Sequence, residues 1–217
     1  MGRRDSAPVA ELRLGASIAM GGPPPMPAQS RALRITAQLA HRCSLVYQGN
    51  MLQYHEFMSG SLEIPAPFPC GGLRVADDWI DYNGHMNEAK YLQAFGDATD
   101  RFMEMVGCDA QYIATGGSYF TAETHIRHVD EALAGVLIEV RTQVLMGAGK
   151  KMHLWHEMYE GDRLLATGEH FLVHVSLETR RPSDPSDAIV AAVERVAAAH
   201  GALGTPEGAR RAVGQRP

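Results

Sequence analysis

The segment IDYNGHMNEAKY, residues 80–91, combines a turn signal with the start of a helix. An Asn-Gly pair flanked by apolar residues is the strongest short-range signal for a tight hairpin turn. The residues that follow do not alternate as a strand would, and their apolar side chains recur at helical spacing instead. The segment therefore predicts a turn that leads directly into a long amphipathic helix.

The sequence marks both ends of this helix. Asn87 is a suitable N-cap, because its side-chain oxygen can accept a hydrogen bond from a free amide of the first turn, and the charge of Glu88 is favourable there. Gly107 is typical of the position just after a helix ends. The predicted apolar face consists of Leu92, Phe95, Ala98, Phe102, Met105 and Val106.

Strand-like segments surround the helix in the sequence. One short strand is expected within residues 71–81, and four more are expected at residues 119–129, 135–145, 151–159 and 163–176. The residues EGDR, 160–163, predict a hairpin turn between the last two. Residues 187–201 predict a second amphipathic helix. One long helix and one antiparallel sheet can bury their apolar faces against each other, which predicts an α+β fold with the sheet wrapped around the helix.

The first part of the chain differs from the rest in composition and periodicity. Residues 20–34, MGGPPPMPAQSRALR, are rich in proline and glycine, and no helical or strand period is sustained up to Met58. Residues 1–64 are therefore interpreted as a disordered N-terminal extension, with Met51 and Met58 as candidate starts. The folded domain is predicted at residues 65–180, and a C-terminal helix with a frayed tail at residues 181–217.

Composition and charge exclude several classes of function. The net charge of −5 and the pI near 6.0 give no general attraction for nucleic acid or anionic lipid, so neither partner is expected. No apolar run approaches the length of a membrane helix, roughly 18 residues, and no secretory signal is expected. Three widely separated cysteines, Cys43, Cys70 and Cys108, do not make a disulfide framework and favour a cytoplasmic protein.

The turn motif and the order of elements resemble a known family. The run Asp81, Gly84, His85, Asn87 and Tyr91 is similar to the motif of hotdog-fold acyl-CoA thioesterases of the 4-hydroxybenzoyl-CoA thioesterase type, which carry an aspartate, a glycine three residues on and a tyrosine ten residues on. Residues 78–100 and 119–135 further resemble the betainyl-CoA thioesterases of bacterial carnitine degradation. The resemblance covers roughly residues 65–176, about half of the chain.

This resemblance implies a catalytic role for the motif. Asp81 would act either as the nucleophile or as the general base for water, and both roles stay open. Amide donors near Gly84 and His85, at the start of the helix that Asn87 caps, would stabilise the thioester oxygen as it gains charge. Gly84 would let the substrate approach the backbone closely. The simpler alternative is that this segment only makes a turn and a helix cap.

The same resemblance implies an acyl-CoA substrate and suggests which residues would bind its acyl group and its CoA part. A betainyl group carries a quaternary ammonium, which aromatic rings attract, and the candidates are Tyr82, Tyr91 and Tyr119, with Glu123 as a polar wall supplied across a dimer interface. Strand alternation places Glu123 on the same face as Tyr119, Thr121, His125 and Arg127. CoA phosphates would meet Arg127, Lys150 and Lys151. Core packing and solubility are the alternatives for each residue taken singly.

The ten histidines do not predict a metal site. His125 and His128 are three residues apart, as are His153 and His156, so each pair points to opposite faces of a strand. No metal or other cofactor is therefore expected. The resemblance implies a homodimer or homotetramer. Two rival functions are a hotdog hydratase, whose pattern has a proline where Gly84 stands and its histidine one residue later, and a non-catalytic acyl-CoA sensor.

Overall fold

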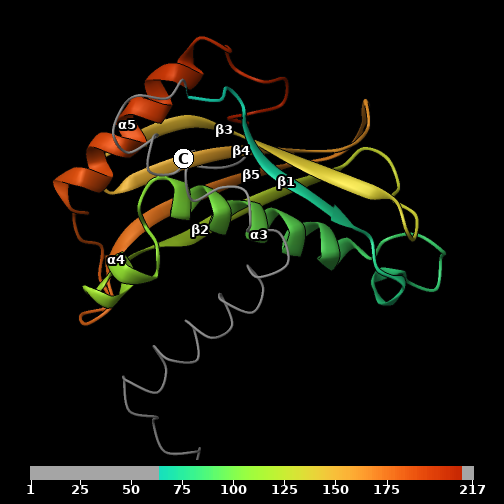
Figure 1. Cartoon of the computed structure of the whole chain (residues 1–217), viewed down its shortest axis with the longest axis horizontal. Coiled ribbons are helices and arrows are strands. Elements are labelled where there is room, and N and C mark those ends of the chain that lie inside the picture. The colour runs from blue at the N-terminus through green and yellow to red at the C-terminus, as the bar shows by residue number, and fades with distance from the viewer. Residues whose placement is uncertain (1–63, 212–217) are drawn as a thin grey trace, which may run out of the picture.

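The computed structural model describes residues 64–211, so most of the predicted N-terminal extension and the last six residues lie outside the described part. Within that part, five strands form one antiparallel sheet in the order β1-β3-β4-β5-β2, and helix α3 lies across one face of it (Figure 1). The strands are β1 (Phe68–Arg74), β2 (Gly117–His128), β3 (Leu137–Ala148), β4 (Lys151–Glu160) and β5 (Arg163–Ser176). The predicted α+β architecture is confirmed.

Helix α3 spans Glu88–Met105 and has the predicted ends. The side chain of Asn87 accepts a hydrogen bond from the amide of Ala89, and Gly107 follows the helix with a positive φ of 87°. The prediction for Leu92 was wrong, because its side chain is 46% exposed and the neighbouring Tyr91 is buried in its place. The buried face comprises Tyr91, Ala94, Phe95, Ala98, Thr99, Phe102, Met103 and Met105.

Three shorter elements complete the fold: the 3₁₀ helix η1 (Asp77–Trp79), helix α4 (Ala110–Ala114) and helix α5 (Asp187–Gly201). Helix α5 has the predicted bounds and packs Val193 and Val196 into one apolar cluster with Phe102 of α3. His200 fixes its end: Nδ1 accepts from the amide of Val144 at 2.9 Å, and Nε2 donates to the carbonyl of Pro65 at 2.8 Å. Burial lowers the pKa of His200 and so favours this neutral form.

A buried polar network lies between α3 and the sheet. His156 contacts the hydroxyl of Thr142 at 2.8 Å through Nδ1 and that of Thr99 at 3.1 Å through Nε2. The ring of His170 stands edge-on to His156 at 4.8 Å. Burial holds the pKa of His156 well below its ordinary value and lowers that of His170 to about 4, so both rings are neutral inside the fold.

The sheet face opposite α3 is crossed by the chain segment after α5, residues 203–211. Gln143 donates a hydrogen bond to the carbonyl of Gly204 at 2.7 Å. The carboxylate of Glu169, which is fully buried, accepts from the amide of Arg210 at 2.6 Å and lies 2.7 Å from Nε2 of His153. These contacts hold the segment against β3, β4 and β5, so both faces of the sheet are at least partly covered.

Gly168 on β5 provides a stability test of the main helix–sheet contact. A Cβ atom at this position would lie 2.8 Å from the Phe95 ring, closer than packing allows. Gly168→Ala is therefore expected to lower the free energy of unfolding by about 2 kcal/mol in urea denaturation. Gly96→Ala on α3, where an added Cβ meets nothing within 4 Å, is the control and should be neutral or stabilising. Equal midpoints for the two variants would contradict this packing.

Candidate active site

The motif of residues 80–91 folds as a closed turn followed by the helix, so both signals in the sequence are realised. The amide of Asp81 donates to the carbonyl of His85 at 3.0 Å, and the amide of Gly84 donates back to the carbonyl of Asp81 at 3.0 Å. The side chain of Asp81 accepts from the amide of Asn83 at 2.7 Å. Gly84 has a φ of 89°, a conformation that glycine adopts without strain.

Hydrogen bonds from neighbouring segments hold this turn in place. The amide of Asn87 donates to the carbonyl of Trp79 in η1 at 2.8 Å, and the amide of Met86 donates to the carbonyl of Ala132 at 2.8 Å. The side chain of Met86 is buried in the core. Asp81 is therefore carried by a rigid turn at the N-terminus of α3, with its carboxylate orientation set by Asn83.

Tyr91 connects α3 to the loop that follows β2. Its ring is buried, and its hydroxyl accepts from the amide of Ala132 at 3.1 Å and donates to the carbonyl of Asp130 at 3.4 Å. Burial raises the pKa of Tyr91, so the hydroxyl keeps its proton. The ring of His128 stands edge-on to the Tyr91 ring, with centroids 4.7 Å apart. Tyr91 thus brings the end of β2 beside the turn.

A cavity of about 560 Å³ opens between the turn, the first residues of α3 and the end of β2. Its walls carry the carboxylates of Asp81, Glu88, Asp130 and Glu131, and no lysine or arginine side chain of residues 64–211 lines it. The remaining lining residues are Tyr82, Asn83, His85, Met86, Asn87, Tyr91, His128 and Val129. The cavity is therefore a negatively charged site with two imidazoles.

The turn leaves one amide of the predicted oxyanion donors available. The amide of Gly84 is used inside the turn, whereas no hydrogen bond within residues 64–211 uses the amide of His85. The imidazole of His85 is half-buried, with Nδ1 3.4 Å from the carbonyl of Met86. His85 N–H, at the positive end of the α3 dipole, is thus the donor best suited to a carbonyl oxygen in the cavity.

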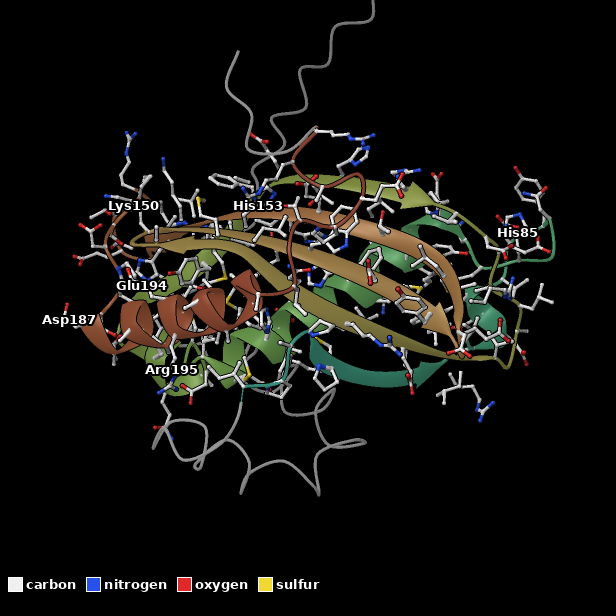
Figure 2. The ribbon with its side chains drawn as sticks, turned by 90° about the horizontal axis from the view of Figure 1, so that it is seen from above. His85, Lys150, His153, Asp187, Glu194 and Arg195 are labelled. Carbon is white, nitrogen blue, oxygen red and sulfur yellow. The ribbon has the colours of Figure 1, made fainter. Side chains whose placement is uncertain are left out.

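The other candidate residues are not gathered at this cavity within one chain. Tyr82 is beside it and 97% exposed, but Tyr119 is buried in the core near α5, where its hydroxyl donates to the carbonyl of Gly149 at 3.3 Å. Lys151 begins β4, and Lys150 pairs with Asp184 at 3.2 Å. Figure 2 shows Lys150 and His85 at opposite ends of the molecule.

The expected alternation along β2 was wrong because of a β-bulge. The pairing of β2 with β5 shifts between Thr121 and Glu123. Tyr119 pairs with His174 and faces α3, whereas Glu123 pairs with Phe171 and faces the other side of the sheet. Arg127 lies on that second face as well, close to Gly208 of the C-terminal segment.

The described residues also bear on metal binding, on cysteine nucleophiles and on membrane-spanning helices. No group of three or more His, Cys, Asp or Glu side chains that could hold a metal ion occurs among residues 64–211. Burial raises the pKa of Cys70 to about 12 and that of Cys108 to about 11, so neither thiol is a nucleophile at neutral pH. None of the described helices has both the length and the apolar character needed to cross a membrane.

With this geometry established, comparisons with known proteins identify the family. The family model of the thioesterase-like superfamily matches residues 75–193, more than half of the chain. The chain belongs to this superfamily. The matched range includes the turn, α3, the four strands from β2 to β5 and the first part of α5. The family resemblance expected from the motif is therefore confirmed.

Curated relatives within this superfamily include both fused and separate proteins. An L-carnitine dehydrogenase/betainyl-CoA thioesterase of Ruegeria pomeroyi is 68% identical over 136 residues, which are 63% of this chain and 28% of that protein. A betainyl-CoA thioesterase of Pseudomonas aeruginosa is 41% identical over 146 residues, which are 66% of this chain and 92% of that protein. The chain thus spans less than a third of the fused relative and nearly all of the separate one.

Two solved structures have a fold similar to that of this chain. A putative thioesterase of Pseudomonas putida is 29% identical with a TM-score of 0.59, and the match covers 71% of this chain and all of that one. A hypothetical protein of Staphylococcus aureus, solved in complex with CoA, is 21% identical with a TM-score of 0.61, covering 67% of this chain and 94% of that one. The hotdog fold predicted from the sequence is confirmed.

His128, Asp130 and Glu131 were not among the site residues predicted from the sequence. They come about 40 residues after the motif, and the contacts of Met86 and Tyr91 with the backbone of Asp130 and Ala132 bring them to it. A signal was present in the sequence HIRHVDE, residues 125–131, where charged side chains gather at the end of a strand.

Proposed function

We propose that this protein is an acyl-CoA thioesterase that hydrolyses betainyl-CoA to glycine betaine and CoA. The observation that carries the proposal is Asp81, held on a rigid turn at the N-terminus of α3 and facing a cavity lined by carboxylates. The name of the P. aeruginosa relative, most of whose length this chain matches, supports the substrate. Neither observation depends on the dehydrogenase part of the fused relatives.

The geometry supports a simple course for the reaction. The thioester oxygen would accept a hydrogen bond from the amide of His85, where the dipole of α3 stabilises the charge that develops on it. The carboxylate of Asp81 would attack the carbonyl carbon or remove a proton from an attacking water. Either route breaks the carbon–sulfur bond, releases CoA as the thiol and leaves a free carboxylic acid.

The charge of the cavity supports a cationic acyl group. A quaternary ammonium has no N–H to donate, so carboxylates and aromatic rings must recognise it through its charge. Glu88, Asp130 and Glu131 supply negative charge, and Tyr82 and Tyr91 supply aromatic rings. The same field would repel acyl groups that carry a carboxylate of their own.

Glu131→Gln tests this recognition. One carboxylate near a cation at a solvated site contributes about 1 kcal/mol, so KM for betainyl-CoA is expected to rise about fivefold. KM for acetyl-CoA, which has no cation on its acyl group, should stay the same. Glu178→Gln, an exposed change after β5, is the matched control. Equal changes in KM for both substrates would show that Glu131 does not contact the ammonium.

We also propose that two copies form a homodimer through β2, in the reducing cytoplasm. β2 is the last strand of the sheet, and its residues from Phe120 to Thr124 are exposed in the single chain. An exposed strand edge of this length favours pairing with another strand. Antiparallel pairing of two such edges would bring the opposite end of the second copy, which carries Lys150, toward the cavity, while Glu123 would stay on the sheet face away from it. Pairing two dimers would give a tetramer. Light scattering after gel filtration distinguishes the monomer, the dimer and the tetramer.

The deciding assay follows free thiol release from betainyl-CoA, acetyl-CoA and 4-hydroxybenzoyl-CoA. A strong preference for betainyl-CoA is the expected result. Hydrolysis of the other thioesters alone would keep the reaction and reject the betaine substrate. Tight binding of acyl-CoA without thiol release would favour a sensor, and hydration of crotonyl-CoA without thiol release would favour a hydratase.

A further inference from the structure

His128 is the second imidazole of the cavity, and it has no role in the reaction proposed above. It is the last residue of β2, and it lines the same cavity as Asp81. Its ring stands edge-on to Tyr91, with centroids 4.7 Å apart and an interplanar angle of 88°. Tyr91 is itself fixed by hydrogen bonds to the backbone of Asp130 and Ala132. The imidazole therefore rests on a rigid support in the cavity that Asp81 also lines.

The nitrogens of His128 are available for chemistry. Within residues 64–211, no hydrogen bond or ion pair occupies either ring nitrogen, whereas His85 contacts the carbonyl of Met86. The other titratable or charged groups that line the cavity are Asp81, His85, Glu88, Tyr91, Asp130 and Glu131, and Arg163 pairs with Asp130 at 2.7 Å. Their net negative charge balances the positive charge that an imidazole gains when it takes a proton.

Thioester hydrolysis needs a group that moves a proton near neutral pH. An aspartate has an ordinary pKa of about 3.9 and is a weak base, whereas an imidazole, at about 6.5, is suited to both taking and giving a proton. A carboxylate and an imidazole in one cavity can therefore take different roles. Asp81 can be the nucleophile that attacks the carbonyl carbon, and the imidazole can be the general base and general acid that takes and gives the proton.

We propose that His128 is the proton-transfer residue of this active site, an inference that rests on the proposed thioesterase function. Asp81 attacks the thioester carbon, the carbon–sulfur bond breaks and the electron pair leaves with sulfur. Water then attacks the resulting anhydride, His128 takes a proton from that water, and the bond to Asp81 breaks to restore its carboxylate. The proton passes from His128 to the CoA thiolate, so the enzyme returns to its starting state.

The first test separates proton transfer from packing against Tyr91. His128→Phe keeps an aromatic ring on Tyr91 and removes both nitrogens. The expected result is a fall in kcat of about a hundredfold, with KM little changed. The part of the dependence of kcat on pH that comes from proton transfer through an imidazole should disappear. His125→Phe, on the same strand but facing the other side of the sheet, is the control and should keep the wild-type kcat and pH profile.

A second test uses chemical rescue. His128→Ala opens space in a cavity that already communicates with solvent, so added imidazole is expected to restore a measurable part of kcat in this variant and none in Asp81→Asn. A His128→Phe enzyme with wild-type kcat and an unchanged pH profile would overturn the proposal, as would His128→Ala without rescue. These outcomes leave the proposed function standing. Absence of thiol release from any thioester in the wild-type protein would instead reject the function itself.

Discussion

Replacing Asp81 with asparagine is expected to reduce kcat for thiol release from betainyl-CoA by about a thousandfold. The side chain of Asp81 accepts a hydrogen bond from the amide of Asn83 at 2.7 Å, and the oxygen of an asparagine can accept the same bond. The turn should therefore stay folded while the negative charge and the nucleophilic oxygen are lost. The loss would be chemical, with KM changed only slightly.

A matched variant makes this result specific. Asp78→Asn removes an exposed carboxylate from η1, three residues before Asp81, and should leave kcat unchanged. Both variants can be compared by circular dichroism and by kcat on betainyl-CoA. An Asp81→Asn enzyme within threefold of the wild-type rate would show that the motif is a structural turn and helix cap, as the simpler alternative holds.

The second large effect concerns stability in acid. The pKa of His170 is about 4 in the folded protein and about 6.5 when the chain is unfolded, and that of His156 is lowered in the same direction. Above pH 6.5 both states hold these rings neutral, so the pH has no effect through them. Below it the unfolded chain takes up protons that the folded protein does not, and stability falls as the pH falls toward 4.

The size of this effect follows from the same values. His170 alone accounts for a loss of about 3 kcal/mol between pH 7.5 and 4, and His156 adds to it. Urea denaturation at pH 7.5 and 4.5 measures most of the change. This range stays above the ordinary pKa of aspartate, so Asp130, whose pKa is lowered by its hydrogen bond to Arg163, contributes little within it.

Variants assign the acid sensitivity to the buried rings. His170→Gln is expected to reduce the difference in unfolding free energy between the two pH values, although it lowers stability at both. His125→Gln removes a partly exposed histidine from β2 and should leave the difference unchanged. An equal free energy of unfolding at pH 7.5 and 4.5 in the wild-type protein would contradict the burial of neutral histidines beneath α3.

The secondary structure could be predicted from the sequence where the signal is local. β5 and α5 have the predicted bounds, because alternation, helical spacing and turn residues all lie within each segment. Helix α4 was not predicted, since its five residues are too few to show a period, even though Asp109 caps it. Leu92 was placed on the wrong side of α3 because apolar residues next to each other give two possible faces.

For the site, too, only the residues with a local sequence signal could be predicted. Asp81, Gly84, His85, Asn87 and Tyr91 lie together because they are consecutive or nearly so, and the turn and N-cap were both readable. His128 and Glu131 reach the cavity only through long-range contacts that no local pattern encodes. The bulge between Thr121 and Glu123 had the same consequence for β2, since one extra residue reverses the faces of all that follow.

The C-terminal segment over the sheet restricts how larger assemblies can be built. Dimers that stacked through the sheet face opposite α3 would have to displace residues 203–211, and displacement would expose the buried carboxylate of Glu169. Leaving such a group without its amide donor costs about 1–3 kcal/mol. Any contact between the proposed dimers is therefore expected to use the α3 side or the ends of the molecule, which leaves residues 203–211 as the outer layer over the far side of the sheet.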